Sequence, residues 1–428
     1  MAGEWEDLTL GDLGRVVTGK TPLTSVEGNF GGRIPFVTPS DMDGRKTIST
    51  TARFLTQAGA ASIKGSVIPA GAIMVSCIGS DMGKVVVAGC ECVTNQQINS
   101  IVVDDRFSSE FVYYSLSTRK DEIRHQAAGG SAVPILNKGD FSRMEITLPP
   151  LAEQKAIAAV LGALDDKIEL NRRMNATLEA MARALFQSWF VDFDPVRAKL
   201  DGRPPAALAP ATAALFPEHF QDSQAGHIPK GWTVGKVSDL ATLNRGAVNP
   251  GDFPTETFDH FSLPAFDNGR TPKAELGSAI MSNKFTVKPN SVLLSKLNPH
   301  IPRIWLPDLH ASRRSVCSTE FMVACSKPGV SREYLFSLFT SSAFASIYGT
   351  LVTGTTGSHQ RIRPESVLDM KIVIPSSALI RAFTDSAKPM FDRINRNTEQ
   401  SRTLATLRDT LLPKLLSGEL SVHGASNI

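Results

Sequence analysis

The stretch "DDKIELNRRMNATLEAMARALFQSWF" (residues 165–190) recurs in altered form as "FDRINRNTEQSRTLATLRDTLLPKLL" (391–416). Both stretches lack glycine, and their seam residues recur at alternating steps of three and four. This spacing is typical of helices that pack along a coiled-coil seam. The predicted seam comprises Leu161, Leu164, Ile168, Asn171, Asn175, Leu178, Ala182, Leu185 and Trp189 in the first helix, and Ala387, Met390, Ile394, Asn397, Ser401, Leu404, Arg408, Leu411 and Leu415 in the second.

Two features favour packing of these helices against each other. Each helical region runs for about 40 residues, or roughly 60 Å, which is longer than a globular domain needs. Asn171 and Asn397 occupy corresponding seam positions. A buried seam asparagine lowers stability but fixes the register and the partner. The alternative is that each amphipathic helix packs only on its own domain.

The rest of the chain also contains an internal repeat. Trp5 matches Trp232 and Gly19 matches Gly246, each at an offset of 227 (232 − 5 and 246 − 19). The helical stretches match at an offset of 226 (397 − 171). A period this long is not that of a solenoid, so each copy must contain a whole domain followed by a helix.

Short apolar runs between Gly, Pro, Ser and Thr fill the part of each copy that precedes the helix. They predict short strands, and a helix is expected near the end of each part, at 108–128 and 331–349. The predicted class is α+β, with two similar mixed α/β domains. The expected order is a first domain (1–150), a first helix (151–193), a linker with one short helix (194–229), a second domain (230–375), a second helix (376–420) and a tail (421–428).

Composition restricts the function classes. A net charge of +3 is too small to predict a polyanionic partner by itself, although a basic face remains possible within it. Five cysteines without paired spacing fit a reducing cytosol, and "CEC" (90–92) lacks the companions of a metal site. The N-terminus shows no basic-then-apolar signal, and no run of 18 apolar residues occurs, so no membrane span is expected.

One motif suggests an enzyme. "GRVVTGKT" (14–21) fits the phosphate-loop pattern G-x-x-x-x-G-K-[ST]. A phosphate loop needs a strand before it and a helix directly after it. Here Pro22 and a loop-like sequence follow, and the second copy has Ala247 and Val248 where Lys20 and Thr21 stand. We therefore expect a turn at a domain edge rather than a nucleotide site.

The sequence resembles the specificity subunits of Type I restriction-modification systems over essentially its whole length. The resemblance is carried by "FGGRIPFVTPSDM" (30–42), "IGSDMGKV" (78–85), "TNQQIN" (94–99), "LLPKLLSGEL" (411–420) and, most specifically, the helical block 148–199. It implies two target-recognition domains, each reading half of a split double-stranded DNA sequence, and an antiparallel coiled coil that sets the spacing.

The resemblance also implies a cytoplasmic location in a bacterium or archaeon, and it implies partners and cofactors. Two copies of a DNA methyltransferase subunit are expected to dock on the chain, with restriction subunits as a further component. S-adenosylmethionine, ATP and Mg²⁺ are expected in those partners, and neither a cofactor nor a catalytic site is expected in this chain. On the helices, Glu153, Gln154, Lys155, Arg172 and Arg173 are candidates for contact with the partners.

Candidate DNA contacts come from residue chemistry. Base edges favour Arg, Lys, Asn, Gln, Ser and Thr, and phosphates favour cations and hydroxyls. For each residue the alternative is a turn cap or a solvated surface charge. The candidates are Lys20, Thr21, Thr38, Ser40, Lys84, Asn95, Gln96, Gln97 and Ser131 in the first domain, and Lys296, His300, Arg303, Arg313, Arg314, Ser358, His359, Gln360 and Arg361 in the second.

Two other functions stay open. A protein-binding scaffold could also use long helices and two adaptor domains. A nucleotide-binding enzyme using Gly14–Thr21 is less favoured, because the motif fails its structural requirement. Duplication and amide-rich loops favour DNA, since paired domains suit a bipartite target.

Overall fold

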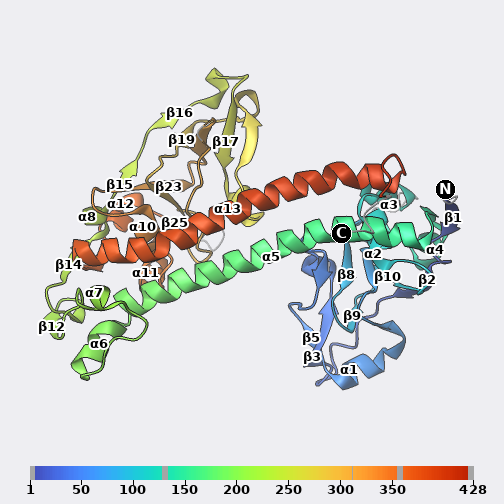
Figure 1. Cartoon of the computed structure of the whole chain (residues 1–428), viewed down its shortest axis with the longest axis horizontal. Coiled ribbons are helices and arrows are strands. Elements are labelled where there is room, and N and C mark those ends of the chain that lie inside the picture. Colours follow the sequence, from blue (N-terminus) through green and yellow to red (C-terminus); the bar gives the residue numbers. More distant parts are fainter. Residues whose placement is uncertain (1–4, 128–133, 311, 354–359, 423–428) are drawn as a thin grey trace. The chain divides into compact units, whose positions relative to one another are not determined.

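The computed structural model describes residues 5–127, 134–310, 312–353 and 360–422. The chain forms two compact units (Figure 1). The first comprises Met1–Asn171 and Gln400–Ile428, and the second Arg172–Glu399. Each unit therefore contains one globular domain and a part of both long helices. Of the described residues, none lies in a helix that is both long and apolar enough to cross a lipid bilayer.

The two long helices are α5 (Leu151–Phe190) and α13 (Ser377–Leu416), with 40 residues each. In the first unit, Arg408 Nη1 donates to Asp165 Oδ1 over 2.7 Å, and Asn171 Nδ2 donates to Gln400 Oε1 over 2.9 Å. In the second unit, Asn397 Nδ2 donates to Asn175 Oδ1 over 2.8 Å. Residue numbers fall along α13 as they rise along α5, so the helices are antiparallel. The predicted fold class, with its antiparallel helix pair, is confirmed.

None of the predicted seam residues is exposed. Leu161, Asn171, Ala182, Trp189, Ala387, Asn397 and Leu415 are buried, and the remaining seam residues are half-buried. The three-four spacing therefore marks the faces that pack, as expected for helices whose side chains interlock along one stripe.

The domain of the first unit contains two sheets and a two-stranded pair. The pair joins the ends of the domain, since β1 (Glu6–Thr9) runs antiparallel to β11 (Glu145–Leu148). One sheet has the order β2 (Gly14–Thr18), β10 (Ile98–Val103), β7 (Ile73–Ser76), β8 (Val85–Ala88) and β4 (Thr47–Ile48). The other has the order β5 (Phe54–Leu55), β3 (Phe30–Val37), β9 (Cys92–Thr94) and β6 (Val67–Ile68). Its helices are η1 (Pro39–Asp41), α1 (Gln57–Ser62), η2 (Lys64–Ser66), α2 (Ser109–Ser117), α3 (Lys120–Gln126) and α4 (Lys138–Arg143).

The second unit repeats this plan. The pair β14 (Thr233–Lys236) and β26 (Lys371–Ile374) corresponds to β1 and β11. One sheet has the order β15 (Ala241–Asn244), β23 (Phe321–Ser326), β20 (Ser291–Ser295) and β21 (Ile304–Trp305). The other has the order β16 (Ala247–Val248), β19 (Lys284–Thr286), β22 (Arg314–Cys317), β17 (Thr257–Phe261) and β18 (Lys273–Leu276). The remaining elements are α8 (Val237–Leu240), η3 (Pro250–Asp252), α9 (Leu263–Asp267), η4 (Gly277–Ala279), α10 (Arg332–Phe339), α11 (Ser342–Tyr348), η5 (Gly349–Leu351), β24 (Val352–Thr353), β25 (Arg361–Ile362) and α12 (Pro364–Leu368).

In each unit the helices share a hydrophobic core with one sheet. In the first unit Leu161 and Leu415 pack with Ile73 and Phe111. In the second, Phe186 lies 5.5 Å from both Tyr334 and Phe383, measured between ring centroids. The sheets containing β3 and β17 share further cores with the helix-side sheets and lie farther from the helices of their own units (Figure 1). The helix-side cores thus fix each domain, and the outer sheets carry its distal loops.

Two details differ from the sequence prediction. The expected helix at 108–128 is interrupted between α2 and α3, where Thr118 Oγ1 donates back to Ser115 O. Its counterpart is interrupted where the Ser341 side chain caps α11 by accepting from Phe344 N. Local side-chain bonds to the backbone compete with a continuous helix at both places. The linker contains α6 (Asp194–Leu200), α7 (Pro210–Ala213) and the antiparallel strands β12 (Phe220–Ser223) and β13 (Gly226–Pro229), not one short helix.

Candidate nucleic-acid interface

Three loops of the first unit meet at one edge of its sheets. We call residues 19–21, 38–41 and 94–97 the first loop cluster. Strands β3 and β9 are parallel, with Val37 opposite Thr94, so the loops that follow them lie side by side. Asn95 N donates to Val37 O over 3.0 Å. The third loop joins them because Gly19 N donates to Ile98 O over 3.0 Å.

Gly19 allows this close approach. A β-carbon at this position would lie 2.1 Å from Asn95 O and 2.3 Å from Thr94 O, both of which are backbone atoms. Only glycine fits such a contact without a shift of the main chain. The glycine that suggested a phosphate loop therefore packs two loops together. Residues 14–18 form strand β2, and residues 19–29 contain no helix, so the nucleotide-site reading finds no structural support.

Several first-domain candidates serve the turns themselves. Asn95 is buried, its Oδ1 accepts from Gln97 N, and its Nδ2 donates to Gln97 Oε1. The Thr38 hydroxyl donates to Asp41 Oδ2 over 2.7 Å. Lys84 forms an ion pair with Asp81 over 2.9 Å and donates to Pro39 O. These side chains hold the loop cluster in shape.

Other candidates are exposed on the same cluster. Lys20, Thr21, Ser40 and Gln96 all face solvent. The Thr21 hydroxyl donates to Gln96 Oε1 over 2.7 Å, and the hydroxyls of Thr38 and Ser40 lie 2.8 Å apart. The cluster thus presents a cation, an amide and hydroxyls together, which is the mixture that phosphates and base edges require.

The arginine candidates of the second unit are matched with carboxylates. Arg303 binds Asp267 through two hydrogen bonds of 2.7 and 2.9 Å, and Arg314 binds Glu256 through two of 2.6 Å. The hydrogen bond to Glu256 raises the pKa of Arg314, and the same bond lowers the pKa of Glu256.

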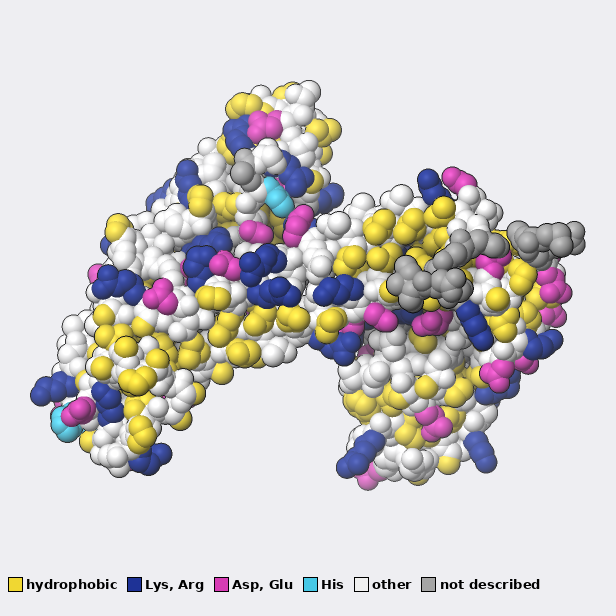
Figure 2. Space-filling model, in the orientation of Figure 1, with side chains coloured by type: hydrophobic (Ala, Val, Ile, Leu, Met, Phe, Trp, Pro, Cys, Tyr) yellow, Lys and Arg dark blue, Asp and Glu magenta, His cyan; other side chains and the backbone are white. Residues whose placement is uncertain are grey.

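Arg313 and Arg361 are matched in the same way. Arg313 lies 3.2 Å from Asp259, and Arg361 lies 2.7 Å from Glu320. Figure 2 shows Lys and Arg side chains interspersed with Asp and Glu on the visible face of this unit. Arg303, Arg313 and Arg314 thus form separate ion pairs, each to a different carboxylate.

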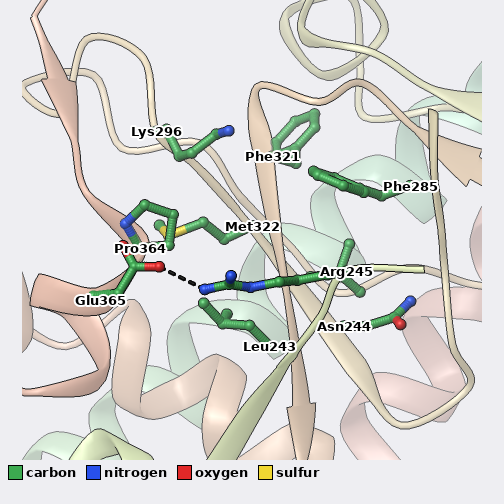
Figure 3. Close-up of a pocket in the computed structure, with 10 residues that line it drawn as sticks. Leu243, Asn244, Arg245, Phe285, Lys296, Phe321, Met322, Pro364 and Glu365 are labelled. Atoms are coloured by element: carbon green, nitrogen blue, oxygen red, sulfur yellow. Dashed lines mark hydrogen bonds and ion pairs between the residues drawn. The ribbon is translucent and has the colours of Figure 1, made fainter. Parts of the chain in front are cut away.

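A hollow of about 290 Å³ lies beside the loop that contains Lys296 (Figure 3). The side chains of Phe285, Phe321 and Met322 make it largely apolar. Arg245 and Glu365 meet at its edge in a salt bridge of 2.5 Å. Lys296 Nζ lies 6.0 Å from the Phe285 ring centroid. Sequence reasoning missed Arg245, although its position directly before Gly246, the counterpart of Gly19, marks the same loop.

The remaining candidates of the second unit have less structural context. His300 is exposed and Gln360 is half-buried. The backbone nitrogen of Asn298 donates to Gln360 O over 2.9 Å, so Gln360 lies beside the loop that contains His300. Ser131, Ser358 and His359 lie outside the described residues.

The candidate partner face on α5 is only partly available. Gln154 is buried, because its Oε1 accepts from Ser108 N and its Nε2 donates to Pro149 O. Gln154 therefore anchors the helix to its domain and is not a surface contact. Lys155, Arg172 and Arg173 are exposed, and Glu153 is half-buried.

Possible metal ligands do not cluster in the described residues. These residues contain no group of three or more His, Cys, Asp and Glu side chains placed to hold a metal ion. Burial raises the pKa of the Cys92 thiol to about 12, and it does the same for Cys77 and Cys317. Such thiols stay protonated near neutral pH, so they are not activated as nucleophiles.

Comparison with known proteins gives a consistent result. The Type I restriction modification DNA specificity domain matches residues 2–180. The chain is 27% identical to the Type I restriction enzyme MjaIX specificity subunit of Methanocaldococcus jannaschii, over 98% of this chain and 94% of that protein. It is 25% identical to the HindI specificity subunit of Haemophilus influenzae, over 67% and 71%.

A solved structure has the same fold. The crystal structure of the Type I restriction-modification S subunit from M. genitalium aligns over 96% of both chains, with a TM-score of 0.57 and 14% identity. The sequence similarity and the shared fold agree with each other, because both extend over nearly the whole chain. The chain is therefore similar in sequence, over nearly its whole length, to the specificity subunits of Type I restriction-modification systems.

Proposed function

We propose that this chain selects the DNA target of a Type I restriction-modification complex, with each domain recognising one half of a bipartite sequence. The observation that carries the proposal is the pairing of one repeated fold with two different loop chemistries. The first loop cluster exposes Lys20 and Thr21, whereas the corresponding positions of the second copy lie in strand β16 and carry Ala247 and Val248. Similar scaffolds with different recognition side chains suit two different half-sites.

The long helices supply the spacing in this proposal. Each is continuous over 40 residues and contributes to both units. A stiff connection fixes the number of base pairs between two half-sites, as dimer geometry does in other DNA-binding proteins. The exposed helical residues Lys155, Arg172 and Arg173 are candidates for docking the partner subunits.

The chemistry belongs to the partners in this proposal. Two methyltransferase subunits would bring S-adenosylmethionine, and restriction subunits would bring ATP and Mg²⁺. This chain would act in the cytoplasm, where the DNA is, without a catalytic site of its own. Its buried, protonated cysteines agree with a recognition role, since they are not poised as nucleophiles.

The test is selection from a random DNA pool by the chain assembled with its methyltransferase subunit. We expect enrichment of a split motif with a fixed spacer and methylation within that motif. Enrichment of one continuous motif would contradict the bipartite proposal. Assembly with the methyltransferase but no sequence preference at all would favour the scaffold alternative.

A further inference from the structure

We infer that Gln96 reads one adenine of the first half-site and that Thr21 is its positioning residue. This inference rests on the proposed function, because it assigns a base contact within the DNA interface. It selects one amide from the three that the "TNQQ" turn offers.

The neighbouring amides are committed to the turn. Asn95 is buried and uses both ends of its amide on Gln97, over 2.8 and 3.1 Å. Gln97 Oε1 accepts one of these bonds. Substituting either residue would therefore change the turn itself, whereas Gln96 is exposed beside it.

One hydrogen bond positions the Gln96 side chain and leaves the rest of its hydrogen-bonding capacity unused. The Thr21 hydroxyl donates to its Oε1 over 2.7 Å across 75 residues of chain. A carbonyl oxygen accepts two hydrogen bonds, so Oε1 keeps one acceptor site, and Nε2 keeps its two hydrogens as donors. The side chain thus retains one acceptor and one donor next to each other.

That donor–acceptor pair matches one base edge. In the major groove, adenine presents the N6 amino group as a donor and N7 as an acceptor, and glutamine bonds both at once. Gln96 Oε1 would accept from N6, and Nε2 would donate to N7. Lys20 is exposed between Gly19 and Thr21 and is positioned for a backbone phosphate beside that base.

The surrounding backbone fixes the direction of the amide. Gly19 packs on the backbone of Thr94 and Asn95, and Asn95 N is tied to Val37 O. A side chain ordered before binding loses less conformational freedom when the contact forms. The Thr21 hydrogen bond therefore contributes to specificity by restricting the rotamers of Gln96.

The experiment uses the full chain assembled with its methyltransferase subunit and a random DNA pool. We expect Gln96→Glu to shift one position of the first half-site from adenine to cytosine, because a carboxylate accepts from the cytosine amino group but cannot donate to N7. Gln96→Ala should lose discrimination at that position by about 5- to 150-fold. The other half-site should not change.

Further variants separate reading from positioning. Thr21→Val should weaken discrimination at the same position. Thr21→Ser, which keeps the hydroxyl, should retain the discrimination of the wild type. Gln57→Glu is the matched control, because Gln57 is an exposed glutamine of the same domain at the start of α1. The control should leave the selected sequence unchanged.

Each outcome has one meaning. If the wild-type complex selects a split motif and Gln96→Glu selects the same motif, the inference is wrong and the proposed function stands. If the wild-type complex selects no sequence, the proposed function itself fails. A change at several positions of both half-sites would show that Gln96 supports the fold rather than reads a base.

Discussion

At the scale of single residues, the environment of a charge decides its use. Arg303 and Arg314 resemble phosphate contacts in sequence, but each is bound by a carboxylate through two hydrogen bonds. Lys20 is exposed on the first loop cluster. A cation bound to a carboxylate must give up that partner to bind a phosphate, so Lys20 is the better candidate.

Substitution of Lys20 tests this difference. Lys20→Ala should weaken DNA binding by a similar factor for all sequences and reduce the slope of log affinity against log salt by about 1. Arg314→Ala is the comparison, and we expect it to lower the stability of the second unit with little change in the salt slope. Binding titrations at several salt concentrations provide the measurement. An unchanged slope for Lys20→Ala would contradict the assignment.

A second residue-scale prediction concerns His260. Burial lowers the pKa of His260 below 6.5, although Glu275, 2.7 Å from its Nδ1, acts in the opposite direction. The unfolded chain therefore binds more protons below pH 6.5. The free energy of unfolding should fall as pH drops from 6.5 towards the lowered pKa, by at most about 1.4 kcal/mol per pH unit.

Between pH 6.5 and about 5, the effect of His260 is separated from that of Glu275. The pKa of Glu275 is also lowered from 4.5, because hydrogen bonds from Lys273 and His260 outweigh burial, so its effect begins only below that pH. Urea unfolding of the wild type and His260→Gln is the measurement. The variant should lose the pH dependence in this window, and equal slopes in both proteins would contradict the prediction.

At the scale of elements, the helix pair combines apolar packing with polar side chains in the same seam. Asn171 and Asn397 are buried, and Asp165 binds both Arg408 and the hydroxyl of Tyr114, each over 2.7 Å. Tyr114 belongs to α2, so this network ties the first domain to both helices. Polar pairs of this kind discriminate between registers, since a shift would bury them without partners.

The Asn175–Asn397 pair tests the register role. Asn397→Leu should lower the free energy of unfolding by about 1–3 kcal/mol, because it removes the donor to Asn175 Oδ1. The double variant Asn175→Leu with Asn397→Leu should recover that stability through apolar packing. Urea unfolding measures both.

The double variant should also tolerate more than one spacer length in DNA selected by the assembled complex. A single sharp spacer, equal to that of the wild type, would show that apolar packing alone fixes the register.

At the scale of the whole molecule, the two copies share a scaffold and differ at the loops. Strand β10 corresponds to β23 at an offset of 223 (321 − 98), which places Ser318 where the first copy has Asn95 and Glu320 where it has Gln97. Glu320 binds Arg361, whereas Gln97 binds Asn95. The same turn is therefore stabilised by different partners, and its recognition surface is free to differ.

Exchange of the second domain tests modular recognition. Replacing residues 230–374 with the second domain of another specificity subunit should change only one half of the selected sequence and keep the spacer length. The two long helices and the first domain are not changed by this exchange. The first half of the selected DNA sequence should therefore be unaffected. Sequencing of methylated DNA after assembly with the methyltransferase is the measurement. A change in the first half would contradict independent reading.

The sequence by itself determined the duplication, the fold class and the seam of the helix pair. Heptad spacing is local information, since each seam residue is identified by neighbours three and four positions away. Only the tertiary structure decided which candidates are available to DNA. Gln96 meets Thr21 across 75 residues, and Arg314 meets Glu256 across 58. From the sequence alone, a polar residue that caps a turn cannot be distinguished from one that forms an ion pair or one that faces solvent. They differ only in the partners that folding brings to them.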